Sequence, residues 1–344
     1  MSKKMMRVDA SNRIVIVLLI LCVSCVFSSC KRQQQTTREF KGNREPVTIG
    51  IAAETLSAPL IIAKEKGYFA DEGLDVTITE YPFGKIALEA MFSGEVHLAT
   101  VAETPIVMNS FKRDDFSVIA MFVYNYDDSK IVVRKDRGIK NAADLKGKKV
   151  GTTFGTSAQF FLDSYLNHNG YARSDVKTVN ISQKNLPAAL KSGEVDAIAV
   201  FEPYGHEAMK LLQDKAMRLP RAEIFRETFN LVAMKEFQKK YPEALAKILK
   251  ALDKAVTFIK NNKEASITVL VQRLNMDKIY LYDTWDDYVF ELSLDQTLLI
   301  NFEDVAHWAL KNRLTDRTDM PNYLDFIYFD GLQSVKPEAV RMIR

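Results

Sequence analysis

From residue 47 onward, apolar positions alternate between short runs typical of buried strands and longer stretches with helical spacing. Runs of the first kind, which predict strands, lie at 47–52, 75–81, 96–101, 116–124, 149–153, 176–182 and 196–200. Stretches with apolar residues three or four apart predict helices at 60–66, 86–92 and 186–191, and a further helix that follows Thr156 and ends near Gly170. Strands alternating with helices predict parallel-type sheets covered by helices.

A short motif, Ser-Gly-Glu-Val, occurs at residues 93–96 and again at 192–195. Each copy opens an apolar run that ends on a carboxylate, Glu103 or Glu202, followed closely by a proline. Other pairs at the same spacing are Gly50 with Gly151, Ser57-Ala58 with Ser157-Ala158, Asp75-Val76 with Asp175-Val176, and Ala90 with Ala189. We interpret the repeat as two similar α/β lobes in tandem. The alternative is a chance recurrence of the turn residues that commonly separate helices and strands in α/β proteins.

The pattern also predicts how the chain is divided. We expect residues 47–130 to form the first part of lobe 1, residues 131–228 to form lobe 2, and residues 229–344 to return to lobe 1 and end in helices. Residues 230–234 would cross back, and an apolar helical stripe would follow Pro242. Because ligands bind beyond the carboxyl ends of parallel strands, two facing lobes would share one cleft, and closure about crossovers near Lys130 and Thr228 would bury a ligand.

The N-terminal residues have the features of a targeting segment. Basic residues precede an apolar run at 14–27, which as a helix would span only about 21 Å, too short for a bilayer core of about 30 Å. Residues 1–29 therefore read as a signal peptide. Two serines before Cys30 resemble a bacterial lipobox, so Cys30 is the expected lipidation site, although Phe27 is less usual than leucine there. The alternative is a plain secretory signal without lipid. Polar residues 30–46 read as a tether.

Composition and motifs give no reason to call the protein an enzyme. The 344 residues are 47% hydrophobic and carry a net charge of +3, with no basic stripe that would favour nucleic-acid binding. Nucleophile-elbow, P-loop, dinucleotide-binding and zinc-protease motifs are missing from the sequence, and its four histidines have no ligand spacing. We therefore expect no catalytic residue, no metal site and no cofactor.

A set of motifs, taken in order along the chain, carries a family resemblance. They are Gly67-Tyr68-Phe69, Glu72-Gly73-Leu74, the two Ser-Gly-Glu-Val copies, residues 144–151 (Asp-Leu-Lys-Gly-Lys-Lys-Val-Gly) and Glu202-Pro203. Together they resemble the solute-binding proteins of ABC importers in the nitrate, sulfonate and taurine group (NMT1/THI5-like), which includes binders of thiamine-pyrimidine precursors. The likeness covers about residues 47–310. It implies a type II periplasmic binding protein fold, with two α/β lobes joined by two crossing strands and a helical C-terminal tail.

Candidate ligand-binding residues lie in the loops that follow the strands. Hydroxyls and free N–H groups before a helix can hold an anionic oxygen, or the hydroxyl can simply cap the helix. For Thr156 and Ser157 the two roles stay open, and Thr55, Ser57 and Thr104 occupy comparable places. Gly84 permits a close backbone approach. The complete expected ligand-binding set is Thr55, Ser57, Gly84, Glu103, Thr104, Asn125, Thr156, Ser157, Glu202 and Tyr204.

The charge of these loops departs from what a small inorganic anion requires. Glu54, Glu103, Asp127 and Glu202 fall in the expected cleft, with Lys85 as the opposing cation and no arginine. A zwitterion or a neutral amine-bearing heterocycle suits this set better than a small anion does.

The resemblance implies a lipid-anchored receptor in the periplasm or at the cell surface. It would be a monomer that captures a small polar organic solute, taurine-like, sulfonate-like or thiamine-pyrimidine-like, and delivers it to an ABC permease with its ATPase. Alternatives are a ligand-sensing domain for a membrane signalling partner, or a pyrimidine-synthase-like enzyme. The latter type carries a cysteine cluster, whereas all three cysteines here lie at positions 22, 25 and 30.

Overall fold

The computed structural model describes residues 42–220 and 224–343. The predicted signal peptide, the lipidation site Cys30 and most of the predicted tether lie outside these residues. Within the described ranges, none of the helices combines the length and the apolar character needed to cross a lipid bilayer.

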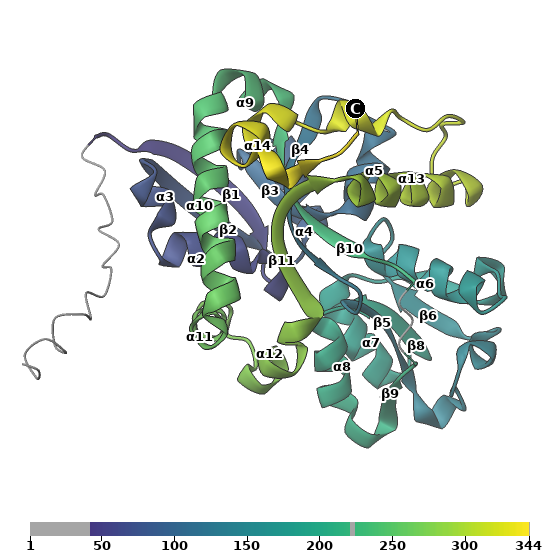
Figure 1. Cartoon of the computed structure of the whole chain (residues 1–344). Coiled ribbons are helices and arrows are strands. Elements are labelled where there is room, and N and C mark those ends of the chain that lie inside the picture. Colours follow the sequence, from purple (N-terminus) through teal and green to yellow (C-terminus); the bar gives the residue numbers. More distant parts are fainter. Residues whose placement is uncertain (1–41, 221–223, 344) are drawn as a thin grey trace, which may run out of the picture. The chain divides into compact units, whose positions relative to one another are not determined.

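The larger of two sheets has seven strands (Figure 1). Their order is β12 (Val340–Arg341), β11 (Tyr288–Asp295), β4 (Phe116–Asn125), β10 (Glu227–Met234), β3 (Leu98–Ala102), β1 (Glu45–Ala52) and β2 (Leu74–Tyr81). Strand β1 pairs in parallel with β2 and β3, whereas β10 runs antiparallel between β3 and β4. We call this sheet and its helices the first lobe.

The smaller sheet repeats part of this arrangement. Its five strands are ordered β7 (Lys177–Asn180), β6 (Lys149–Thr152), β8 (Ala197–Phe201), β5 (Ser129–Arg134) and β9 (Ala216–Arg218). Strand β6 pairs in parallel with β7 and β8, and β5 runs antiparallel beside β8, as β10 does beside β3. We call this sheet and its helices the second lobe. Both sheets are thus mixed, with a parallel core and antiparallel strands.

The repeated motif occupies equivalent places in the two lobes, so this prediction is confirmed. Gly94 ends α4 (Gly84–Phe92) and Gly193 ends α7 (Leu186–Ser192), with φ angles of 79° and 80° that favour glycine. The strands that follow, β3 and β8, are both fully buried.

Helices cover both sheets. Those of the first lobe are α2 (Ala58–Glu65), α3 (Tyr68–Asp71), α4, α5 (Glu103–Ser110), α9 (Lys235–Lys240), α10 (Pro242–Asn261), α11 (Lys263–Leu274), α12 (Lys278–Thr284), α13 (Gln296–Lys311) and α14 (Phe329–Val335). Those of the second lobe are α6 (Ser157–His168), α7 and α8 (Tyr204–Leu212). Short 3-10 turns lie at Thr55–Ser57, Lys135–Arg137, Ala142–Leu145, Arg173–Asp175, Gln183–Asn185, Gln213–Lys215, Trp285–Asp287, Tyr323–Phe326 and Pro337–Ala339.

The predicted helical stripe after Pro242 becomes α10, the longest helix in the described part of the chain (Figure 1). Its apolar positions are buried and pack against α2, α3 and α14: Leu245, Ile248, Leu249, Leu252, Val256 and Ile259. Burial of this stripe, at about 25 cal/mol per Å² of apolar surface, fixes the helix on the first lobe.

The C-terminal region is mainly helical, as the sequence predicts, but it also adds two strands to the larger sheet. Strand β11 pairs antiparallel with β4 and extends the larger sheet, and β12 pairs with β11. Residues 288–295 alternate between buried and more exposed positions along most of their length, which is the strand period rather than the helical one. The flanking helices α12 and α13 agree with the prediction.

Two segments connect the lobes, one from β4 to β5 and one from β9 to β10. They lie next to the crossovers expected near Lys130 and Thr228. Helical contacts add to them: Lys210 Nζ of α8 lies 3.1 Å from an oxygen of Asp277, directly before α12, and Trp308 Nε1 of α13 donates to Asp163 of α6 at 2.9 Å.

Candidate functional site

A small cavity of ≈ 20 Å³ lies where the two lobes meet at the carboxyl ends of β1, β3 and β8. Its walls also include the starts of α4, α6 and β10. The lining residues are Glu54, Phe83, Gly84, Lys85, Ala102, Pro105, Thr156, Ser157, Phe201, Glu227 and Phe229. This is the edge at which parallel α/β sheets present ligand-binding groups.

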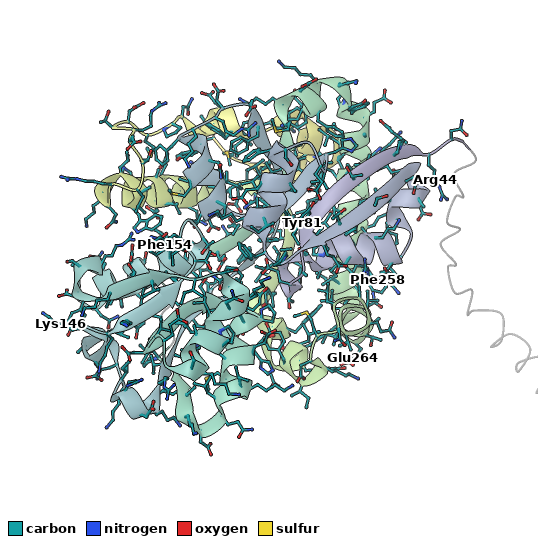
Figure 2. All side chains as sticks on the ribbon, turned by 180° about the vertical axis from the view of Figure 1, so that it is seen from behind. Arg44, Tyr81, Lys146, Phe154, Phe258 and Glu264 are labelled. Carbon is teal, nitrogen blue, oxygen red and sulfur yellow. The ribbon has the colours of Figure 1, made fainter. Side chains whose placement is uncertain are left out.

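Contacts between the lobes close this cavity. Lys85 Nζ of the first lobe donates to the carbonyl of Phe154 at 3.1 Å, and the Tyr204 hydroxyl of the second lobe donates to the carbonyl of Pro82 at 3.1 Å. The rings of Phe83 and Phe201 pack with centroids 6.1 Å apart. Figure 2 labels Phe154 on the side of the second lobe that faces the first. The structure is therefore a closed arrangement of the two lobes.

The size of the cavity limits what this closed arrangement can hold. One water needs about 10–15 Å³ of such volume, so ≈ 20 Å³ leaves room for about one water molecule. A solute of several heavy atoms enters only if the lobes move apart, with the connection from β4 to β5 as a hinge.

Two carboxylates on the cavity wall are almost fully buried. Glu54 follows β1 and is 4% exposed, and its Oε2 has no hydrogen-bond partner. Glu227 begins β10, is 3% exposed and accepts a hydrogen bond from Ser129 Oγ at 2.9 Å. Burial, with the nearby charges of Asp128 and Glu227, raises the pKa of Glu54 well above its usual value. Burial and the charge of Glu103 raise the pKa of Glu227 to about 8, against hydrogen bonds from Ser157 and Ser129.

Glu103 is buried beside this cavity but does not line it. Its Oε2 accepts from the N–H of Thr228 at 2.7 Å and from the Thr228 hydroxyl at 2.9 Å, and its Oε1 accepts from Thr104 at 3.2 Å. Burial raises the pKa of Glu103 to about 7, and these hydrogen bonds oppose the rise. The carboxylate thus joins α5 to β10 inside the first lobe, and Thr104 is turned toward it.

A second group of charges lies at the hinge. Lys130 Nζ donates to Glu202 Oε1 at 2.6 Å and to the carbonyl of Asp127 at 2.9 Å, and Glu202 also accepts from the N–H of His206 at 2.9 Å. Asp127 forms an ion pair with Arg218. Asp127, a carboxylate expected in the cleft without an opposing arginine, is thus paired by Arg218 from β9, whereas the described wall of the cavity between the lobes contains no arginine.

Three of the residues predicted to bind ligand line the cavity: Gly84, Thr156 and Ser157. The others are buried or half-buried nearby with partners of their own. Thr55 lies 4.0 Å from the sulfur of Met276, and Ser57 Oγ lies 3.3 Å from Thr100 Oγ1, within the first lobe. Asn125 accepts from the N–H of Asp127, and Tyr204 closes the cavity through Pro82.

Gly84 is required by packing as well as by the cavity. A Cβ atom at this position would lie 2.8 Å from Val101 Cα and 3.0 Å from the carbonyl oxygen of Thr100, both of them backbone atoms of β3. The start of α4 therefore touches β3 directly, in keeping with the predicted close approach.

The start of α6 is arranged differently from an ordinary capped helix. The Thr156 hydroxyl donates to the carbonyl of Thr153 at 2.7 Å, and no side chain caps the helix at its first turn. Thr156 and Ser157 nevertheless line the cavity, and Ser157 also forms a hydrogen bond with the carboxyl group of Glu227.

Sequence reasoning missed part of the wall. Phe83, Phe201 and Phe229 give it three aromatic rings, and Glu227 gives it a second carboxylate. Glu227 directly precedes the apolar run predicted to cross back, and an acidic residue at the start of a buried strand was the signal available. Glu54 and Lys85 were recognised as charges of the cleft but not as binding residues.

Two larger hollows lie elsewhere. One of ≈ 320 Å³ lies beside the hinge between α8 and α12, and one of ≈ 570 Å³ lies on the first lobe near Phe111 and Phe326. The first of these is lined by Asp127 and Glu202, which follow the carboxyl ends of β4 and β8, whereas the second lies away from the strand ends that the lobes share. Across residues 42–220 and 224–343, no group of three or more His, Cys, Asp or Glu side chains is placed to hold a metal ion.

Two α/β lobes that meet over a cavity at their strand ends define the class of periplasmic binding protein folds. A structure of the periplasmic aliphatic sulphonate binding protein SsuA from Escherichia coli superposes with a TM-score of 0.71 at 21% identity, covering 83% of this chain and 92% of that one. The desulfurization enzyme DSZB superposes with a TM-score of 0.67 at 16% identity, covering 86% of this chain and 99% of that one. The same fold therefore serves both binding proteins and an enzyme.

The family follows from the sequence itself. The sequence signature of the family described as NMT1/THI5 like matches residues 54–266, and the chain belongs to this family. A Bacillus subtilis (strain 168) protein assigned to the binding of aliphatic sulfonates is 26% identical over 270 residues, 77% of this chain and 78% of that protein. The taurine-binding periplasmic protein of Escherichia coli (strain K12) is 25% identical over 224 residues, which are 63% of this chain and 68% of that protein. The predicted family resemblance and fold class are confirmed, and the chain is a solute-binding protein of this family.

Proposed function

We propose that the protein is the substrate-binding component of an ABC importer. It captures a small polar organic solute, sulfonate-like, taurine-like or thiamine-pyrimidine-like, between its lobes and delivers it to a membrane permease that works with an ATPase. The observation that carries this proposal is the cavity between the lobes, which is lined by residues of both and closed by contacts such as that of Lys85 with Phe154.

The closed arrangement supports capture rather than simple surface binding. The hydrogen bond of Tyr204 to Pro82 and the contact of Phe83 with Phe201 join the lobes beside the lining residues. A solute held there is shielded from water, and the closed surface is one that a permease can distinguish from the open one.

We further propose that the chain acts as a monomer anchored through lipid on Cys30, in the periplasm or at the cell surface. The two serines before that cysteine and the apolar run at 14–27 support this. Mass spectrometry of the membrane-extracted protein tests it, since lipidation requires cleavage before Cys30 and adds acyl mass to that residue. An unmodified Cys30, or cleavage elsewhere, contradicts the anchor and leaves solute binding unaffected.

Native mass spectrometry of the protein purified from its own cells tests solute capture. We expect a co-purified small molecule that dissociates when the protein is unfolded. A thermal-shift screen against sulfonates, aminopyrimidines and amino acids is the complementary measurement, because a ligand that binds only the folded state must raise its stability. Absence of any bound molecule together with absence of stabilisation across these classes contradicts the proposal.

Because the enzyme DSZB has the same fold, the alternative function to test is that of an enzyme. All three cysteines of this chain precede residue 42, so the cavity in the described residues contains no thiol nucleophile. Turnover assays of the bound solute decide between the two functions: a binding protein returns it unchanged. For the ligand-sensing alternative, the test is whether the loaded protein associates with the permease.

A further inference from the structure

The cavity wall has two buried carboxyl groups and only one cation, Lys85, among the described residues that line it. Glu54 and Glu227 both line it and both are almost fully buried, and Glu54 Oε2 lacks a hydrogen-bond donor. A buried carboxylate oxygen without a donor is unfavourable and rare in a folded protein. A partner that supplies N–H groups and a positive charge would satisfy it.

Cations of the protein near this wall are engaged elsewhere. Lys130 donates to Glu202 and to the carbonyl of Asp127, and Lys85, the cation on the wall itself, donates to the carbonyl of Phe154 at 3.1 Å. Neither makes a hydrogen bond with Glu54 or Glu227 among the described contacts. Among the described residues, neither carboxyl group therefore has a hydrogen-bonded cation as a partner, although the charge of Lys130 acts on Glu227.

The rest of the wall suits the same kind of ligand. The rings of Phe83, Phe201 and Phe229 lie on it, and aromatic faces attract a cation through their quadrupole. Carboxylates and aromatic rings together recognise an ammonium group, whereas a bare anion placed here would meet both Glu54 and Glu227.

We infer that the solute carries a protonated amine, which Glu54 and Glu227 bind, and that an anionic group without such an amine is rejected. This inference rests on the proposed function and deepens it, because it assigns the charge that the cavity selects. Where the solute also has an anionic group, the start of α6 at Thr156 and Ser157 and the ammonium of Lys85 lie on the same wall to receive it.

Matched probes test this inference on the whole protein. Taurine is compared with ethanesulfonate and ethanolamine with ethylene glycol, each pair differing in an amine that is protonated at neutral pH. We expect the amine of at least one pair to raise the melting temperature and its partner to leave it unchanged. In Glu54→Gln and in Glu227→Gln, affinity for that amine should fall roughly 10- to 100-fold, the range for a lost hydrogen bond to a charged group. Glu194→Gln, the same change at an exposed position, is the control and should bind as the wild type does.

Two outcomes overturn the inference, and they differ in what they leave standing. If ethanesulfonate or another amine-free probe binds as tightly as its amine partner, or if both Gln variants bind the amine normally, charge selection is refuted while solute capture stands. If no probe of either kind stabilises the protein and no molecule co-purifies with it, the proposed function falls together with the inference.

Discussion

Replacing Lys130 by methionine tests the electrostatics of the hinge. Lys130 Nζ lies 2.6 Å from Glu202 Oε1, and the two side chains are 7% and 6% exposed. Methionine has a similar length, so the change removes the charge and keeps most of the volume. The carboxylate of Glu202 then keeps only the N–H of His206 as a partner. Removing one member of a buried ion pair costs about 3–5 kcal/mol, because it leaves the other charge buried and unpaired.

The Lys130 charge also acts on other groups, which favours the upper end of this range. Burial raises the pKa values of Asp128 and Glu227, and the charge of Lys130 opposes both rises. At about 2 °C per kcal/mol for a chain of this size, Lys130→Met should lower the melting temperature by roughly 6–10 °C. Urea unfolding at neutral pH gives the free-energy difference directly.

A double variant distinguishes charge from packing. Lys130→Met combined with Glu202→Met should recover much of the loss, since an apolar pair often replaces a buried ion pair without cost. A penalty below about 1 kcal/mol for Lys130→Met, or no recovery in the double variant, refutes the assignment of this pair as a hinge anchor.

Three further changes follow from the described contacts. Because the pKa of Glu227 is raised to about 8, the folded state holds its proton while the unfolded state has released it between about pH 4.5 and 8. The free energy of unfolding of the wild type should therefore decline with rising pH in this window. In Glu227→Gln the decline of this free energy with pH should be shallower by up to about 1.4 kcal/mol per pH unit, and equal slopes in the two proteins contradict this. Gly84→Ala should cost about 1–3 kcal/mol in urea unfolding, because its Cβ would lie 2.8 Å from Val101 Cα; wild-type stability would show that α4 shifts freely. Trp308→Phe removes the hydrogen bond to the buried Asp163 and should cost about 1.5–3 kcal/mol, and a neutral result would mean that Arg173 alone satisfies this carboxylate.

The sequence was sufficient for the parts of the fold that depend on local periodicity. Strand runs such as 47–52 and 116–124 differ from β1 and β4 by a few residues at most, and the helical stripe after Pro242 is α10. The repeat could be recognised in the sequence because glycines such as Gly94 and Gly193 recur in it. They adopt a left-handed conformation that few other residues tolerate. These features are set within one element and its ends.

The tail was less predictable because pairing partners decide it. Strand β11 forms against β4, more than 160 residues earlier in the chain, and its neighbours α12 and α13 favour a helical reading of the whole region. The 3-10 turn Ala142–Leu145 shows a similar limit, since the ends of such turns depend on capping groups like Asn141.

The site was predictable only in outline. Strand ends could be located, and Gly84, Thr156 and Ser157 do line the cavity. Which carboxylate faces it could not be read from the sequence, because that depends on tertiary partners. Glu103 is bound by Thr228, 125 positions away, whereas Glu54 has no such partner for its Oε2. A residue's type in a strand-end loop therefore indicates a candidate, and the hydrogen bonds it has already made decide its availability.

Closure and charge are linked in this protein at the cavity wall. Glu54 and Glu227 both belong to the first lobe, and closure covers them with residues of the second lobe such as Ser157 and Phe201. The resulting burial disfavours the ionised carboxylates and raises their pKa values. A cationic solute offsets this cost in the closed arrangement, where the two carboxyl groups are shielded from water. Its binding free energy is then coupled to closure, since a ligand shifts an equilibrium by its difference in affinity for the two states. If that coupling operates, the empty protein should favour the open state more strongly at high pH, where both carboxylates are charged, and a solute amine should matter most there.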